Sequence, residues 1–197
     1  MLHNPKTDLN FIFLHLILNK MSLEIVLGPM FSGKSSYALS YVRRQRAIGK
    51  RVLVIKPNID NRYSNDPVIV THNNEKIPCM MWHIDKPLCE ISDINYDCFV
   101  IEEAQFFNHL EYFCSSLLLK EHKHILVVGL DGCAQQKKFG EVLDIIPLAT
   151  SVTKLSALCS DCKDGTPAHY TKKLEEGGIQ VDVGGAEKYV AVCLRHL

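Results

Sequence analysis

The sequence predicts an α/β fold in which a mostly parallel sheet carries helices on both faces. The first observation is that segments rich in Val, Ile and Leu alternate with segments of helical periodicity along most of the chain. The second is a loop of two glycines, a lysine and a serine that directly follows the first apolar segment. The third is a glycine- and charge-rich tail from Cys159 onward, which holds no long apolar run and therefore predicts a small separate subdomain.

The apolar segments predict five buried strands, and the periodic segments predict two helices. The strands are expected at Glu24–Gly28, Arg51–Pro57, Asp97–Glu103, His124–Gly132 and Ser151–Leu158. One helix is expected over Lys34–Ala47, where Gly49 marks its end, and the other over Leu110–Lys120.

Several polar or glycine residues follow these strands. In a parallel sheet the carboxyl ends of the strands meet at one edge, and the ligand binds beyond that edge. We therefore expect Gly28, Lys56, Glu102 and Asp131 to converge there.

Residues 1–21 differ from the rest and are expected to form an extension outside the main domain. The apolar block Phe11–Leu18 is far shorter than the roughly 20 residues of a membrane span, so no membrane anchor is expected. The extension is either dispensable, or a stretch upstream of a native start at Met21, or an extra strand or helix packed on the core. Residues 22–158 then form the α/β domain and residues 159–197 the small subdomain.

The composition favours a small-molecule partner over nucleic acid. Lys plus Arg and Asp plus Glu both number 22, so no net positive field attracts a phosphate backbone. The eight cysteines occur without an export signal, and disulfides are therefore not expected. Four of them, Cys79, Cys89, Cys98 and Cys114, are interpreted as small buried apolar side chains.

The loop GPMFSGKS matches the pattern G-x-x-x-x-G-K-[ST] at every fixed position. Such a loop directs backbone N–H groups at phosphates between a strand and the N-terminus of a helix. Lys34 would supply positive charge to the terminal phosphates, and Ser35 would offer a hydroxyl to Mg²⁺. The alternative is a chance match in a turn, which the strand and helix context disfavours. The predicted phosphate-binding residues are Gly28, Pro29, Met30, Phe31, Ser32, Gly33, Lys34 and Ser35.

Two adjacent glutamates end the predicted third strand. One carboxylate after such a strand is the expected partner of phosphate-bound Mg²⁺, a role that suits Glu102. Glu103 would then accept a proton from a hydroxyl nucleophile or position a water. In the polar loop after the second strand, Arg62 would stabilise charge on the transferring group and Asp60 would help to order Mg²⁺. The alternatives are solvated acids at a helix N-terminus and a surface salt bridge.

The tail contains a C-x-x-C pair, Cys159 and Cys162, and a C-x-x-H pair, Cys193 and His196. Three thiolates and one imidazole in two closely spaced pairs are typical of a structural zinc site. The alternative is a redox C-x-x-C with an unrelated Cys and His, but a redox motif does not need the second pair. The glycine-containing segment between the pairs would form a lid over a small substrate, held at both ends by the metal.

Further motifs occur in order along the chain: DNRYS, EEAQFF, LDGCAQQKKFG, YTKK and VGGAEKY. Together with the phosphate loop and the metal pairs, they resemble the type II thymidine kinases over Leu23–His196. This resemblance implies a P-loop, RecA-like domain and a zinc-containing lasso that closes over the nucleoside. It implies ATP as the donor with Mg²⁺ and thymidine as the acceptor. It also implies a cytoplasmic homotetramer that is inhibited by dTTP, and the short extension and the missing regulatory tail are similar to viral members.

The resemblance also implies site residues. Glu103 matches the catalytic carboxylate, and Lys34 and Arg62 would assist the transfer. The ATP and Mg²⁺ positions are Gly28–Ser35, Asp60, Arg62, Glu102 and Gln105. The nucleoside pocket is matched by Met30, Phe106, Ala134, Phe139, Thr171 and Tyr189, together with the lasso segment Gln180, Val181, Asp182, Val183 and Gly184, whose backbone would bind the thymine ring.

Four residues depart from the family pattern. Glu102 replaces a usual Asp, Ala104 a usual Gly and His196 a usual fourth Cys, which zinc tolerates. Ala134 stands where many members have an aromatic residue, so we expect either a roomier nucleoside pocket or another side chain in the gap.

Two other functions fit part of the pattern. A zinc-containing P-loop ATPase acting on nucleic acid would use the same phosphate loop and metal pairs, but it would need a basic surface that the balanced charge does not favour. A regulatory nucleotide-binding module would leave Glu103 without a role.

Overall fold

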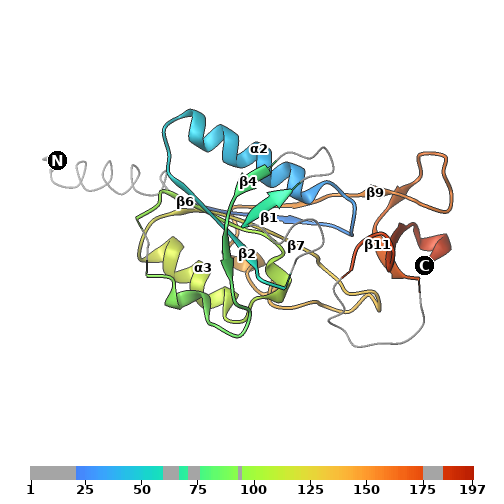
Figure 1. The fold of residues 1–197 in the computed structure, drawn as a ribbon. Coiled ribbons are helices and arrows are strands. Elements are labelled where there is room, and N and C mark those ends of the chain that lie inside the picture. The colour runs from blue at the N-terminus through green and yellow to red at the C-terminus, as the bar shows by residue number, and fades with distance from the viewer. Residues whose placement is uncertain (1–20, 60–66, 71–75, 93–94, 175–183) are drawn as a thin grey trace, which may run out of the picture.

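The structure is a computed structural model that describes residues 21–59, 67–70, 76–92, 95–174 and 184–197. A six-stranded sheet lies at its centre, in the order β5-β2-β6-β7-β1-β8, and every neighbouring pair in it is parallel (Figure 1). The strands are β1 (Ser22–Leu27), β2 (Val52–Pro57), β5 (Met80–Trp82), β6 (Cys98–Ile101), β7 (His124–Gly129) and β8 (Ser151–Lys154). The predicted α/β class with a parallel sheet is confirmed.

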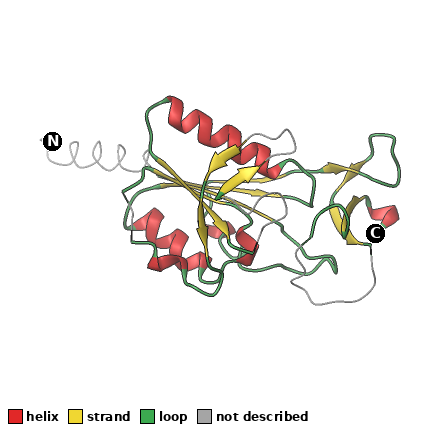
Figure 2. Cartoon of the chain, viewed as in Figure 1, coloured by secondary structure: helices red, strands yellow, loops and turns green. Residues whose placement is uncertain are grey.

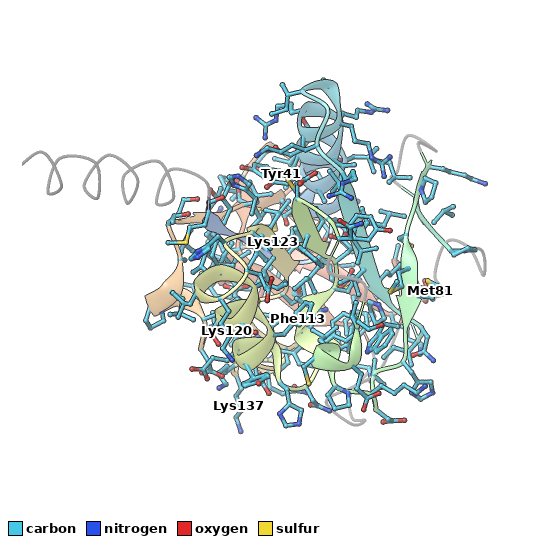
Figure 3. All side chains as sticks on the ribbon, turned by 90° about the vertical axis from the view of Figure 1, so that its left-hand side faces the viewer. Tyr41, Met81, Phe113, Lys120, Lys123 and Lys137 are labelled. Atoms are coloured by element: carbon cyan, nitrogen blue, oxygen red, sulfur yellow. The ribbon has the colours of Figure 1, made fainter. Side chains whose placement is uncertain are left out.

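Helices α2 (Lys34–Ala47) and α3 (Leu110–Leu119) cover opposite faces of this sheet. Figure 3 shows Tyr41 of α2 above the sheet and Phe113 of α3 below it. Both helices agree with the predicted ranges to within one residue at each end.

The alternation of side chains along each strand explains why both faces are apolar. Ile25 of β1 pairs with Val127 of β7, and both belong to the buried cluster that includes the inner face of α3. Their neighbours Val26 and Val128 also pair, and they belong to the cluster that includes the inner face of α2. Residues 25–27 of β1 and 125–129 of β7 are therefore buried, whichever face of the sheet their side chains point to.

Shorter elements complete the main body. The hairpin of β3 (Val68–Val70) and β4 (Lys76–Pro78) packs Ile69 and Ile77 into the cluster under α2. The 3-10 helices are η1 (Leu88–Glu90), η2 (Ala104–Phe106), η3 (Ile146–Leu148) and η4 (Leu194–His196). Within the described ranges, no helix combines the length and apolar character needed to cross a membrane.

A C-terminal lobe, residues 157–174 and 184–197 of the described chain, lies beyond the carboxyl ends of the sheet strands (Figure 2). It contains two small antiparallel sheets. One pairs β9 (Ala157–Leu158) with β10 (Pro167–Ala168), and the other pairs β11 (Tyr170–Lys173) with β12 (Tyr189–Val192).

Three strand predictions were too long. The third strand ends at Ile101, so Glu102 and Glu103 follow it, and the fourth ends at Gly129. The predicted strand Ser151–Leu158 is split, because the chain leaves the central sheet after Leu155, whose N–H still donates to Leu27 O at 2.8 Å.

The cysteine interpretation was partly wrong. Cys98 and Cys114 are buried as expected, and burial raises the pKa of both thiols. Cys79 is only half-buried, and Cys89 is exposed because η1 turns it away from the core. The predicted extension lies, apart from Met21, outside the described residues.

Candidate functional site

The segment Gly28–Gly33 connects β1 to α2, in the strand–loop–helix arrangement that the motif requires. Gly28 has φ 152°, and a Cβ there would lie 2.7 Å from Ser32 Oγ and 2.8 Å from Leu155 O, so a side chain does not fit. The Lys34 ammonium donates to Pro29 O at 2.6 Å and the Ser32 hydroxyl donates to the same oxygen at 2.8 Å. The loop is therefore curled tightly around its own backbone.

Glu102 and Ser35 lie together beside this loop. The Ser35 hydroxyl donates to Glu102 Oε1, and Glu102 is only 3% exposed. The Glu102 N–H donates to Ile55 O at 2.9 Å, which fixes the residue at the carboxyl end of the sheet. A hydroxyl and a carboxylate are oxygen ligands of the kind that Mg²⁺ prefers, so the two side chains fit this ion.

Glu103 lies directly before the 3-10 turn η2, as its N-cap residue, in a left-handed conformation with φ 52°. Gln105, in the same turn, donates from Nε2 to Glu103 Oε2 at 2.6 Å. Its other amide atom, Oε1, accepts from Leu130 N at 3.0 Å. The turn thus projects the Glu103 carboxylate from the strand end and connects it to the segment that follows β7.

A compact apolar cluster adjoins the phosphate loop. Its buried members are Met30, Leu130, Cys133, Phe139 and Tyr189, and Phe31, Phe106 and Ala134 pack against them. The rings of Phe106 and Phe139 meet edge to face with centroids 5.4 Å apart. Thr171 Oγ1 accepts from the buried Met30 N–H at 3.0 Å, so β11 of the C-terminal lobe is tied to the phosphate loop.

The structure therefore brings together six residues predicted for the nucleoside pocket: Met30, Phe106, Ala134, Phe139, Thr171 and Tyr189. Sequence reasoning missed Leu130 and Cys133, although both belong to the LDGCAQQKKFG motif. Ala134 is partly buried and packs against the cluster.

A cavity of about 410 Å³ lies next to this cluster. It is lined among others by Pro29, Cys133 and Thr171, and by Asp131 and Lys154, which form an ion pair at 2.6 Å. Asp131 thus lies at the predicted edge of the sheet. Lys56 is buried in β2, one residue before the end of that strand.

Cys159, Cys162, Cys193 and His196 form a second candidate site in the C-terminal lobe, where their ligand atoms all lie within 4.8 Å of one another. His196 Nδ1 lies 3.5 Å from Cys159 Sγ, 3.4 Å from Cys162 Sγ and 3.4 Å from Cys193 Sγ, and the Cys162 and Cys193 sulfurs are 3.7 Å apart. Zinc bonds of about 2.3 Å to sulfur and about 2.0 Å to nitrogen give tetrahedral edges of about 3.8 Å and about 3.5 Å. The four side chains therefore fit a zinc ion.

The surroundings affect the three thiols differently: hydrogen bonds lower the pKa of Cys159 and Cys193, whereas burial raises the pKa of Cys162. Burial raises the pKa of the Cys159 thiol, but hydrogen bonds from the backbone of Cys162 and Cys193 outweigh this effect and lower the pKa to about 6. The hydrogen bonds of His196 to Cys159 and Cys193 raise the pKa of the imidazole.

Six predicted site residues lie outside the described residues: Asp60, Arg62, Gln180, Val181, Asp182 and Val183. Gly184 is described and buried, and it precedes the turn that leads into β12.

Comparison with known proteins gives one consistent result. The family model for thymidine kinase matches residues 21–197. A thymidine kinase of Oryza sativa subsp. japonica is 42% identical over 183 residues, which cover 88% of this chain and 65% of that protein. The cytosolic thymidine kinase of Homo sapiens is 37% identical over 177 residues, covering 87% and 70% of the two chains. The thymidine kinase of Yaba monkey tumor virus is 37% identical over 174 residues, covering 87% and 91%. The chain therefore belongs to the thymidine kinase family of enzymes.

Proposed function

We propose that this protein transfers the γ-phosphate of ATP to the 5′-hydroxyl of thymidine and so forms dTMP for deoxynucleoside salvage. The observation that carries the proposal is the meeting of three features at one edge of the sheet. These are the phosphate loop, the Glu103 carboxylate and the apolar cluster around Phe139. The membership of the family supports the same reaction.

The phosphate loop and its neighbours would hold the donor. Backbone N–H groups of the loop and the N-terminus of α2 would surround the phosphates, with Lys34 released from Pro29 to meet them. Ser35 and Glu102 would hold Mg²⁺, which supplies charge neutralisation for the phosphate oxygens when bound. Asp60 and Arg62 would complete the donor site, and Arg62 would stabilise charge on the transferring group.

Glu103 is proposed as the general base. Its carboxylate takes the proton of the 5′-hydroxyl as that oxygen attacks the γ-phosphorus and the bond to ADP breaks. The left-handed backbone at Glu103 supports this role, because strained non-glycine residues cluster at functional sites.

The acceptor would bind between the apolar cluster and the lasso. Phe106, Phe139 and Tyr189 offer aromatic surface to a base, while the backbone of Gln180–Gly184 would bind the thymine ring. A structural zinc ion on the Cys159, Cys162, Cys193 and His196 side chains would hold both ends of the lasso.

Further properties are proposed from the family pattern. We expect a cytoplasmic homotetramer inhibited by dTTP, with residues 22–158 as the ATP-binding domain and residues 159–197 as the lasso subdomain. Size-exclusion chromatography with light scattering, with and without dTTP, measures the oligomeric state directly.

A coupled assay of ADP release, with and without thymidine, tests the reaction. We expect ADP release to require thymidine and the Glu103→Gln variant to lose about 100- to 10,000-fold in kcat. ATP turnover that is independent of any nucleoside but stimulated by DNA or RNA would instead identify a nucleic-acid ATPase.

A further inference from the structure

Gln105 is buried, with 3% of its surface exposed, and both ends of its amide are used. Nε2 donates to Glu103 Oε2 at 2.6 Å and Oε1 accepts from Leu130 N at 3.0 Å. A backbone N–H can only donate, so the amide oxygen must face Leu130 and the NH₂ group must face Glu103.

Gly129 and Gly140 have no side chains, and Gln105 occupies the space that their Cβ atoms would take. A Cβ at Gly129 would lie 2.8 Å from Gln105 Oε1. A Cβ at Gly140 would lie 2.2 Å from Gln105 O, and Gly140 has a φ of 62°. Larger residues at either position would displace the glutamine, so its side chain and its backbone are both enclosed by the segment that follows β7.

That segment is also part of the apolar cluster. Leu130, which donates to Gln105, packs with Phe139 in the cluster proposed to bind the nucleoside. At its far end Glu141 accepts from the N–H groups of His109 and Glu111, which fixes the segment to the start of α3. Gln105 therefore connects the Glu103 carboxylate to the acceptor pocket, because its side-chain hydrogen bonds within the described residues are to Glu103 and Leu130.

We propose that Gln105 is a positioning residue that orients the Glu103 carboxylate relative to the nucleoside pocket, and that it is not an ATP contact. This inference rests on the proposed function, in which Glu103 is the base. The chain Glu103–Gln105–Leu130, which ends in the proposed nucleoside pocket, then helps to set the distance between base and hydroxyl.

Steady-state kinetics of two variants test the inference. Gln105→Met removes both hydrogen bonds with little change of volume, and Gln105→Glu keeps an acceptor for the Leu130 N–H while replacing the donor to Glu103. We expect both to lower kcat by about 10- to 100-fold with the KM for ATP unchanged. The exposed Gln135, in the same segment, gives the matched control Gln135→Ala, which should keep the kcat of the natural enzyme.

A double-mutant cycle distinguishes a role of Gln105 in orienting Glu103 from a general disruption of the structure. In the Glu103→Gln background, Gln105→Met should have no further effect on kcat, because the group it orients is already gone. An equal loss in both backgrounds, or a raised KM for ATP with kcat retained, would overturn the inference. Absence of thymidine-dependent ADP release in the natural enzyme would refute the proposed function itself, which keeps the two failures distinct.

Discussion

The central sheet and the C-terminal lobe are stabilised by different means. The sheet buries large side chains such as Phe99, Ile101 and Leu126, each worth about 1.5–3 kcal/mol on burial. The lobe buries mainly small ones, including Ala168 and Ala191, and a methyl group contributes only about 0.8 kcal/mol. A lobe with so little apolar burial needs another source of stability, and the Cys₃His cluster is placed to supply it.

The largest expected effect comes from the proposed zinc ion. Structural zinc contributes about 10–16 kcal/mol in small zinc domains, so chelation or Cys162→Ser should unfold the lobe while the sheet stays folded. Hydrogen exchange should then become fast in β11 and β12 and remain slow in β1 and β7. Zinc content measured on the same sample gives the stoichiometry.

Cys89→Ser provides the control for this experiment, because Cys89 is an exposed cysteine outside the cluster. It should change neither zinc content nor exchange. Slow exchange in β11 and β12 after complete chelation would show that the lobe is stable without metal.

A matched pair of valines sharpens the comparison at a smaller scale. Val100 in β6 and Val192 in β12 are both fully buried. Replacing each by Ala removes similar apolar surface, at a cost of about 2 kcal/mol. Val100→Ala should lower the midpoint of global unfolding. Val192→Ala should instead weaken zinc binding by about 30-fold, because folding of the lobe and metal binding are linked.

Competition with a chromogenic chelator measures the zinc affinity, and thermal denaturation measures global stability. If Val192→Ala lowered global stability as much as Val100→Ala, with unchanged zinc affinity, the two regions would form a single cooperative unit.

The junction between the regions can be weakened by Thr171→Val. This change keeps the shape of the side chain but removes the acceptor of the buried Met30 N–H, at a cost of about 1–3 kcal/mol. Faster hydrogen exchange of the Met30 amide is the expected result. Thr171→Ser, which keeps the hydroxyl, should preserve slow exchange.

The smallest effect is expected for the ion pair between Asp131 and Lys154. Half of the Lys154 side chain is exposed, so the pair should contribute only about 0.2–1 kcal/mol. A double-mutant cycle with Asp131→Asn and Lys154→Met measures this coupling by denaturant unfolding. A coupling energy above that range would mean that the edge of the sheet depends on this contact.

The sequence was sufficient to predict the longer strands and helices. Runs of Val, Ile and Leu that are buried on both faces predict parallel strands, and β1, β2 and β7 begin close to their expected positions. The short strand β5 was missed because three residues, Met80–Trp82, give no periodicity to recognise. The same reason explains why β9–β12 were not predicted individually, since each has only two to four residues.

The candidate sites were predictable where the spacing of residues along the sequence forms a recognisable motif. Cys159 and Cys162, with Cys193 and His196, lie together as their pairing predicts. The contacts of Gln105 with Glu103 and Leu130 depend on how a 3-10 turn meets the end of a different strand. The local sequence pattern does not encode this contact, because it depends on the register between β6 and β7.

The hydrogen bond from the Met30 N–H to Thr171 has a consequence for how the two substrates influence each other. Met30 belongs to the proposed ATP loop, and β11 belongs to the lobe that would cover thymidine. A ligand that orders one partner lowers the entropic cost of ordering the other. Thermodynamic reciprocity then requires that thymidine raise the affinity for ATP by the same factor as ATP raises the affinity for thymidine.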